Sequence, residues 1–153
     1  MRSPQQSTIV YTPLEERHLE AILPIEAEAY PEAWTVGMFR DEMRSQRSYF
    51  RVIFAGETLI GYCGYWLVLD EAHITSVTVA QAFRGQGYGR EQLTHLLEAA
   101  REQGAVLATL EVRESNLPAK SLYENIGFRR VGLRKGYYSK TNENALVMLK
   151  DLV

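Results

Sequence analysis

The chain has 153 residues, of which 46% are hydrophobic and 24% are charged; these values predict one packed domain, residues 1–153, and exclude a disordered chain. The formal net charge is −2, and a composition that is not strongly basic disfavours nucleic acid as a direct partner. No continuous apolar run is long enough to span a bilayer, which disfavours a membrane protein.

The first half of the chain shows two helical patterns between extended ones. Pro24 lies inside the first helical pattern and predicts a break or a kink there. The tripeptide "AGE" at residues 55–57 predicts a hairpin between two strands. The ranges expected from these patterns are a strand at 8–11, helices at 14–30 and 36–45, and strands at 49–54, 58–69 and 72–79.

The second half predicts two helices among three strands. The helix at 91–103 ends at Gly104, and the shorter helix at 117–126 is capped by Asn116 and ended by Gly127. The apolar face of the longer helix, with i, i+3, i+4, i+7 spacing, consists of Leu93, Leu96, Leu97 and Ala100. The expected strands are 106–112, 128–133 and 145–149. This order predicts a mixed α/β or α+β sheet with helices packed on it.

A glycine-spaced turn, "RGQGYG" at residues 84–89, separates an expected strand from the longer helix. Glycines let the backbone approach an anion, and the free N–H groups and dipole of a helix N-terminus favour negative charge. The turn therefore predicts a phosphate ligand, with an ordinary strand-to-helix turn as the alternative. A dinucleotide fingerprint would need glycine at position 90, where Arg90 stands, and no lysine follows as in a nucleoside triphosphate loop.

The pattern R-x-x-G-x-G at this turn resembles the acetyl-coenzyme A loop of the GNAT acetyltransferases, and the order of elements is similar to that fold. The resemblance implies a central, mostly antiparallel sheet flanked by helices, with acetyl-coenzyme A as cosubstrate and no metal. It implies that the turn holds the pyrophosphate, through Arg84, Gly85, Gln86, Gly87, Tyr88, Gly89 and Arg90. It also implies that the preceding strand offers its main chain to the pantetheine arm, at Val77, Thr78 and Val79.

A second group of residues lies between positions 107 and 132. Glu111 is a carboxylate near the end of an otherwise apolar strand, where it is costly unless it is paired, hydrated or functional. The alternative interpretation is that the Glu111 side chain simply projects into solvent at the strand end. Tyr123 lies beside the apolar stripe of the next helix, and the residues alone favour an aromatic that closes the edge of the core.

The sequence "LEVRESN…A…SLYENIGF" resembles the RimI-type branch of the GNAT family, whose members acetylate the amino-terminal alanine of a small-subunit ribosomal protein. The resemblance implies Glu111 as general base, Tyr123 as general acid and a contact of Asn116 with the acetyl-coenzyme A arm. The segments "YPEAWTVGMFRDEM" and "RKGYY" also resemble the branch. They supply the candidates for the acceptor groove, with ordinary packing as the alternative: Trp34, Tyr137 and Tyr138.

Direct acetyl transfer to an α-amine is consistent with these residues. An α-amino group has a pKa near 8 and lysine one near 10.4, so a carboxylate, directly or through water, is a plausible base for a protein N-terminus. Burial would ideally raise the pKa of this carboxylate, and a protonated tyrosine can supply a proton to the thiolate. A main-chain N–H of the strand before the turn could polarise the thioester. Other amines remain as acceptors: lysine, a polyamine or an antibiotic.

The remaining reactive residues predict no further chemistry. The lone Cys63 is expected to be a packed thiol, and the spacing of His18, His73 and His95 indicates no metal site. One cysteine and an N-terminus without the apolar core of a secretory signal predict a cytoplasmic protein. A coenzyme A-binding module without catalysis would be expected to lack the Glu111–Tyr123 pair, and a nucleotide-binding regulator is disfavoured by the glycine spacing. Oligomeric state stays open.

Overall fold

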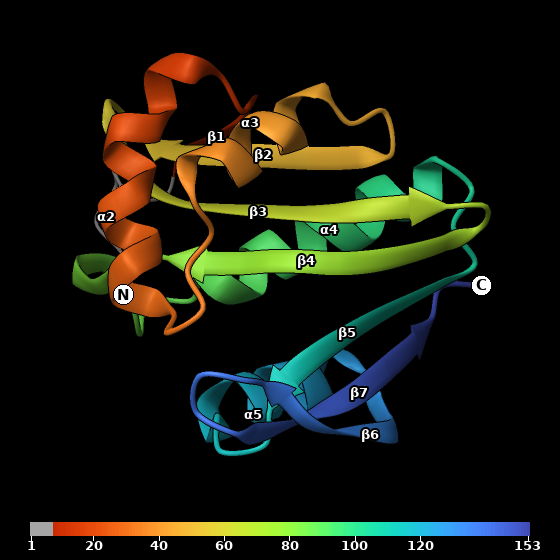
Figure 1. Cartoon of the computed structure of the whole chain (residues 1–153). Coiled ribbons are helices and arrows are strands. Elements are labelled where there is room, and N and C mark those ends of the chain that lie inside the picture. Colours follow the sequence, from red (N-terminus) through yellow and green to blue (C-terminus); the bar gives the residue numbers. More distant parts are fainter. Residues whose placement is uncertain (1–7) are drawn as a thin grey trace.

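A computed structural model describes residues 8–153, so the first seven residues of the expected 1–153 domain lie outside the described part. Seven strands form one sheet in the order β1-β2-β3-β4-β5-β7-β6. All neighbouring strands pair antiparallel except β4 and β5, which are parallel. The strands are β1 (Ile9–Pro13), β2 (Ser48–Ala55), β3 (Thr58–Val68), β4 (Glu71–Val79), β5 (Leu107–Arg113), β6 (Arg129–Tyr138) and β7 (Glu143–Asp151). The predicted mixed, mostly antiparallel sheet is confirmed (Figure 1).

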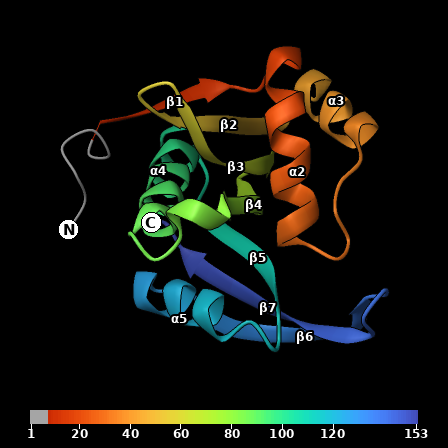
Figure 2. The ribbon, with the colours of Figure 1, turned by 90° about the vertical axis from the view of Figure 1, so that its left-hand side faces the viewer.

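Helices cover both faces of this sheet (Figure 2). The helical elements are η1 (Glu16–His18), α2 (Leu19–Ala29), α3 (Val36–Arg44), η2 (Gln81–Phe83), α4 (Tyr88–Glu102) and α5 (Leu117–Ile126). Buried side chains of α4 join those of β3, β4 and β5 in the larger core, against which α5 also packs. A second core lies between α2, α3 and the opposite face of β2 and β3. Along β5, buried positions alternate with partly buried ones, because one face of the strand packs into the larger core.

Two expected helix starts were wrong, and the break expected at Pro24 does not occur. The first helix was expected from residue 14, but residues 14–15 are not helical, and α2 continues through Pro24. Proline removes one backbone donor, and here the helix tolerates that loss. α4 begins at Tyr88, three residues before the expected start, because Gly87 with φ +88° already forms its N-terminal boundary.

The last hairpin is longer than expected, since β6 extends to Tyr138 and β7 begins at Glu143. The extra residues are polar or aromatic and show no clear strand pattern on their own. They pair across the hairpin, Arg134 with Ala145 and Tyr138 with Glu143. Tertiary pairing therefore decided this strand length rather than local propensity.

The sheet opens between β4 and β5, and this opening positions the site. The parallel register joins only Glu71–His73 with residues 107–109, after which the strands diverge (Figure 1). β4 is also irregular here, since Gly64 pairs with Ser76 and Tyr65 with Ile74, which leaves Thr75 as an extra residue. A bulge of this kind bends the strand and redirects its side chains. The divergence and the bulge together create a cleft at the middle of the sheet.

Cys63 is fully buried in the larger core, as the sequence predicted. Burial raises the pKa of its thiol. Because a reactive cysteine needs an accessible thiolate, Cys63 is a packing residue and not a nucleophile.

Candidate active site

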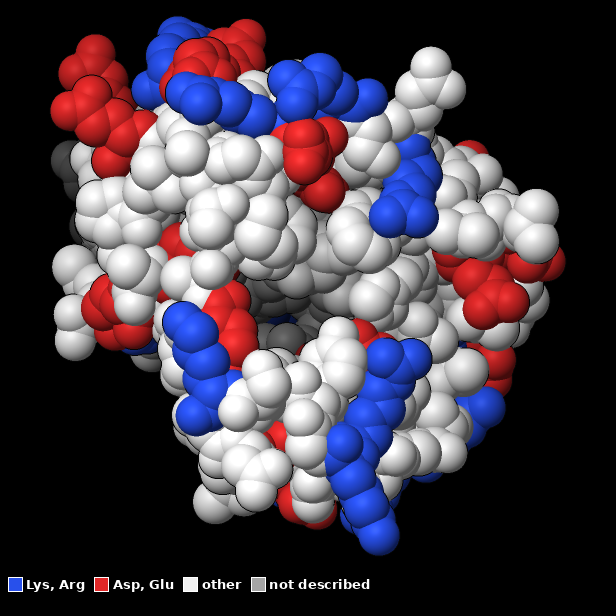
Figure 3. Space-filling model, viewed as in Figure 1, with Lys and Arg blue, Asp and Glu red and all other residues white. Residues whose placement is uncertain are grey.

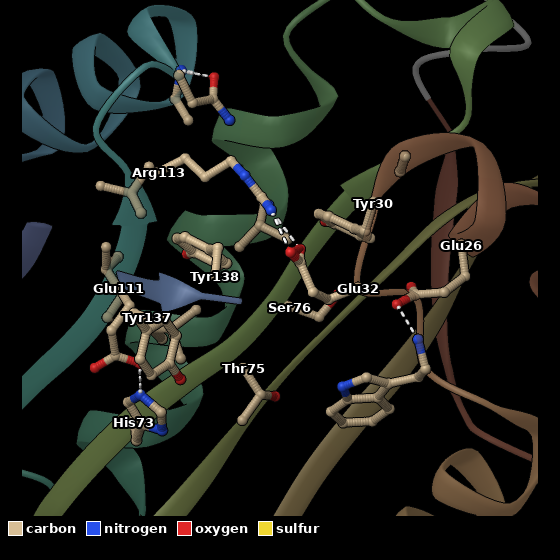
Figure 4. A pocket seen from close by; sticks show the side chains of 18 of the residues that line it. Glu26, Tyr30, Glu32, His73, Thr75, Ser76, Glu111, Arg113, Tyr137 and Tyr138 are labelled. Atoms are coloured by element: carbon tan, nitrogen blue, oxygen red, sulfur yellow. Dashed lines mark hydrogen bonds and ion pairs between the residues drawn. The ribbon is translucent and has the colours of Figure 1, made fainter. Parts of the chain in front are cut away.

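A cleft of about 670 Å³ occupies the opening between β4 and β5. Figure 3 shows it as a hollow in the front face, with acidic and basic side chains at its rim. Its walls come from the segment between α2 and α3, from β4 and β5, from α5 and from the β6–β7 hairpin (Figure 4). The predicted residues that line it are Trp34, Val77, Glu111, Asn116, Tyr123, Tyr137 and Tyr138.

The glycine turn lies outside this cleft, between the end of β4 and the start of α4. Gly85 and Gly87 have φ of +78° and +88°, a region that residues with a Cβ adopt only at a cost. Gly89 is already helical, in the first turn of α4, and a Cβ there would lie 3.6 Å from Leu122 Cδ2. The first N–H groups of a fifteen-residue helix therefore face the turn, as phosphate binding requires.

Two side chains of the turn, those of Arg84 and Tyr88, contact other parts of the protein. Arg84 donates from Nε to the carbonyl oxygen of Val79 at 2.9 Å and forms an ion pair with Glu28 at 2.6 Å. Tyr88 is only 1% exposed and its ring packs in the larger core. At that position the group available to a ligand is the main-chain N–H. Gln86 and Arg90 lie in the same turn and in the first turn of α4.

The end of β4 next to the turn presents main chain to the cleft. The pairing with β5 ends at His73, so the segment Val77–Val79 borders the opening. The Thr78 side chain is 2% exposed, and its hydroxyl bonds to the hydroxyl of Tyr30 at 2.6 Å and to that of Ser76 at 2.8 Å. Thr78 therefore uses its side chain inside the protein, and its carbonyl oxygen accepts from Nε2 of Gln92 at 3.1 Å. Of these three strand residues, Val77 is the one that lines the cleft.

Glu111 lies on β5 with a side chain only 12% exposed and lines the cleft, so the alternative of a side chain that projects into solvent is excluded. Its Oε1 is 2.8 Å from Nε2 of His73 on β4 (Figure 4). This hydrogen bond lowers the pKa of Glu111, and electrostatic interactions with His73 and Arg134 act in the same direction. Burial acts in the opposite direction but is outweighed. The expectation that burial would raise this pKa was therefore wrong, because the sequence does not show the His73 partner.

Tyr123 reaches the cleft from α5 and packs its ring against Phe128, with centroids 6.0 Å apart. Burial raises its pKa, and the nearby hydroxyls of Tyr30 and Tyr138 act in the same direction. Its phenol therefore stays protonated at neutral pH and can donate a proton. Asn116 also lines the cleft, but its Oδ1 accepts from the N–H of Ala119 at 3.2 Å and caps α5, as the sequence predicted.

The three acceptor-groove candidates all line the cleft but differ in their packing. Tyr137 is 45% exposed, and its ring meets that of Tyr138 edge-on at 5.1 Å. Trp34 packs on Phe39 at 5.2 Å and belongs to the second core. Trp34 therefore combines a packing role with a place on the cleft wall.

Sequence reasoning missed two charged anchors of the cleft. Glu26 is buried and accepts from the Tyr62 hydroxyl at 2.7 Å and from the Trp34 N–H at 3.0 Å. Arg113 donates to Glu32 at 2.7 Å, which ties β5 to the segment after α2 across the cleft mouth (Figure 4). In the sequence, Glu26 and Arg113 are marked only as charged residues within otherwise apolar patterns.

Arg113 also connects the two strands of the last hairpin. Its Nε donates to Glu143 of β7 at 3.1 Å, and its guanidinium lies 3.9 Å from the ring centroid of Tyr138 on β6. One side chain therefore holds three parts of the cleft wall.

Two classes of feature are not found in the described part of the chain. Residues 8–153 contain no group of three or more His, Cys, Asp or Glu side chains that could hold a metal ion. Within the same residues, no helix combines the length and the apolar character that a membrane crossing needs.

The comparisons with known proteins agree with this geometry. The model of the acetyltransferase (GNAT) family matches residues 19–128, more than half of the chain. A putative ribosomal protein bS18-alanine N-acetyltransferase of Bacillus subtilis is 36% identical over 131 residues, 85% of this chain and 87% of that protein. The enzyme of that name from Haemophilus influenzae is 33% identical over 142 residues, 91% of this chain and 96% of that protein.

A solved structure shares the fold over nearly the whole chain. The crystal structure of the ribosomal-protein-S18-alanine N-acetyltransferase from Escherichia coli has a TM-score of 0.85 and 28% identity, and the match covers 95% of this chain and 94% of that one. The predicted resemblance to RimI-type enzymes is confirmed. The chain belongs to the acetyltransferase (GNAT) family and is an acetyl-coenzyme A-dependent N-acetyltransferase.

Proposed function

We propose that this enzyme transfers the acetyl group of acetyl-coenzyme A to the N-terminal α-amino group of a protein, namely the N-terminal alanine of ribosomal protein bS18. The observation that carries this proposal is the cleft in which Glu111 and Tyr123, from different elements, line one space between the diverging strands. The printed names of the relatives support the choice of acceptor.

The residues present fit acetyl-coenzyme A. The N–H groups at the start of α4, together with the positive-φ glycines of the turn, would hold the pyrophosphate. The open edge of β4 at Val77–Val79 would carry the pantetheine arm and offer a main-chain N–H to the thioester carbonyl. Asn116 would contact this arm from the start of α5, on the cleft wall. When bound, acetyl-coenzyme A supplies an activated acetyl group as a thioester.

Two residues of the chain would transfer the protons of the reaction. An α-amine with a pKa near 8 is about one-tenth neutral at pH 7, so the enzyme needs to remove one proton from the ammonium form. Glu111 would accept this proton, directly or through a water molecule. The neutral nitrogen attacks the acetyl carbonyl, the C–S bond breaks, and the nitrogen loses a second proton, which would return to Tyr123 after that residue has protonated the thiolate. Tyr123 would then protonate the departing thiolate, since its phenol keeps its proton at neutral pH.

The acceptor would enter along the wall formed by Trp34, Tyr137 and Tyr138, past the Arg113–Glu32 ion pair. Aromatic side chains offer apolar surface for the first side chain of a peptide with little loss of rotamer freedom. These three residues are therefore proposed to contact the peptide, while Glu111 acts on its amine and Tyr123 on the departing thiolate.

Two matched peptides test this function. Both carry the N-terminal sequence of bS18 and an internal lysine, and one has its α-amine blocked. We expect acetyl transfer only to the open peptide. Transfer to both would identify a lysine or broad amine acetyltransferase, and transfer to neither would direct the search to small amines, with acetyl-coenzyme A binding measured to confirm an intact site.

A further inference from the structure

The His73–Glu111 hydrogen bond is the most specific contact in the cleft without a role in the reaction described above. The two residues are 38 positions apart, and their side chains meet because β4 and β5 still pair at His73 before they diverge. Both side chains line the cleft. The Glu111 side chain is 12% exposed and that of His73 is 33% exposed, so His73 is the member nearer to bulk water.

Glu111 alone is a poor acceptor for the proton of an α-ammonium group. The hydrogen bond from His73 lowers the pKa of Glu111 below its ordinary value near 4.5. An α-ammonium has a pKa near 8, so the gap exceeds about three pH units, or roughly a thousandfold in equilibrium. A general base works best when its pKa is close to the working pH. An isolated imidazole, with a pKa near 6.5, meets this condition far better than the carboxylate.

We propose that His73 and Glu111 accept the proton of the acceptor amine as one hydrogen-bonded pair, in which His73 carries the proton and returns it to solvent. Before transfer the pair is a neutral imidazole beside a carboxylate. The N–H bond of the ammonium breaks, an N–H bond of the imidazole forms, and the pair becomes an imidazolium beside the same carboxylate. Glu111 stabilises that cation, as a carboxylate does beside a catalytic histidine. The proton then leaves from the more exposed member, His73.

The groups around the pair are compatible with this role. From β6, Arg134 and the hydroxyls of Tyr137 and Tyr138 interact electrostatically with Glu111. From β3 the neighbour of His73 is Trp66, whose ring centroid lies 6.0 Å away. The carboxylate that directly contacts the imidazole is that of Glu111.

The test is the pH dependence of kcat/KM, with the open bS18 peptide, in the wild type and in His73→Gln. Glutamine can keep a hydrogen bond to Glu111 but cannot titrate. Because the pair takes its proton from the ammonium form, which predominates below about pH 8, kcat/KM of the wild type should fall in acid with a slope of one on a logarithmic plot, owing to protonation of the pair. His73→Gln should lose this acid limb between about pH 5 and 7 and have an activity about tenfold or more lower at pH 8. Glu111 adds no slope between about pH 5 and 7, because its pKa is lowered.

Two results would overturn the proposal: a His73→Gln enzyme that keeps the acid limb at full activity, or one that is slower at all pH values with the acid limb unchanged, as a structural role would give. A second measurement needs no acceptor. The imidazole NMR signals of His73, assigned by their loss in His73→Gln, should titrate with the midpoint of the acid limb and change when Glu111 becomes Gln. If the His73 signals do not change in Glu111→Gln, the two residues do not titrate as a pair and the proposal is refuted.

This inference rests on the proposed function only for the choice of peptide. A wild type that acetylates no N-terminal peptide would refute the proposed acceptor, and the NMR titration would still decide whether His73 and Glu111 act as a pair. A wild type that acetylates the peptide, with a His73→Gln profile like its own, would leave the proposed function intact and refute this inference.

Discussion

The turn at the start of α4 and the wall formed by β5, β6 and β7 present functional groups in two different ways. The turn uses the backbone: Gly85 and Gly87 adopt positive φ, and the Tyr88 side chain is buried, so the ligand would meet main-chain N–H groups. The wall uses side chains that reach the cleft from separate elements, such as Glu111 and Tyr123.

Because of this difference, substitutions in the turn and in the wall should have different effects. A backbone site depends on local conformation and tolerates a change of side chain wherever that conformation survives. A side-chain site depends on distant partners, as Glu111 depends on His73. Substitutions at the wall should therefore affect turnover or peptide binding, and substitutions that disturb the turn should affect acetyl-coenzyme A binding. Five predictions test this division.

The largest effect is expected for Glu111→Gln. Loss of the carboxylate should lower kcat by roughly a hundredfold or more, a typical contribution of acid–base catalysis. The acetyl-coenzyme A Kd, measured by calorimetry, should stay within about twofold, because Glu111 is not part of the turn. A Kd that rises together with the fall in kcat would show that the two regions are not separate.

Tyr123→Phe should lower turnover by roughly tenfold to a hundredfold, because the thiolate would then leave without its proton donor. The ring contact with Phe128 is kept in this variant, so thermal stability should change little. Single-turnover kinetics check the chemical step directly. A variant with undiminished turnover would remove Tyr123 from the role of general acid.

Gly87→Ala should act on the other region. At φ +88° a Cβ costs about 1–2 kcal/mol, and relief of this strain would displace the N–H groups at the start of α4. We expect acetyl-coenzyme A to bind about tenfold more weakly. The matched control is Gly104→Ala, since Gly104 also has positive φ, +97°, and no neighbour within 4 Å of an added Cβ, but lies after the far end of α4.

Both glycine variants should lose similar stability, and only Gly87→Ala should lose binding. Equal binding losses in the two variants would mean that the turn has no special part in holding the cosubstrate. Thermal unfolding and calorimetry on the same samples provide the two measurements.

Arg113→Lys should raise KM for the peptide several-fold with a smaller change in kcat. Lysine keeps the charge but cannot hold Glu32, Glu143 and the Tyr138 ring together with one planar group. Arg129→Ala is the control, since that arginine forms an exposed ion pair with Asp151 on the same hairpin, and exposed pairs contribute little. An unchanged KM in Arg113→Lys would exclude the ion-pair cluster from acceptor binding.

The smallest effect concerns stability in acid. The folded-state pKa of Glu111 is lowered, so its contribution to stability is fully present above its unfolded-state pKa near 4.5 and is lost as pH falls through the lower folded-state value. Urea unfolding between about pH 5 and 3 should show a shallower pH dependence in Glu111→Gln than in the wild type. Parallel curves would mean that the hydrogen bond with His73 does not perturb this carboxyl in solution.

Prediction from sequence succeeded where the signal was local. The caps of α5 are an example: Asn116 bonds to the N–H three residues later, and Gly127 adopts φ +111° directly after the helix. It failed where partners were distant. The length of β6 depends on pairing with β7, and the lowered pKa of Glu111 depends on a histidine 38 residues away.

The amino-acid sequence by itself determined the glycine turn, the helix boundaries at Asn116 and Gly127, and the apolar face of α4, because these features depend on residues within a few positions of each other. The tertiary structure alone decided where β4 and β5 separate, and hence that His73 meets Glu111 at the edge of a cleft. A single sequence contains no measure of which strands pair or where pairing ends, since that depends on packing summed over the whole sheet.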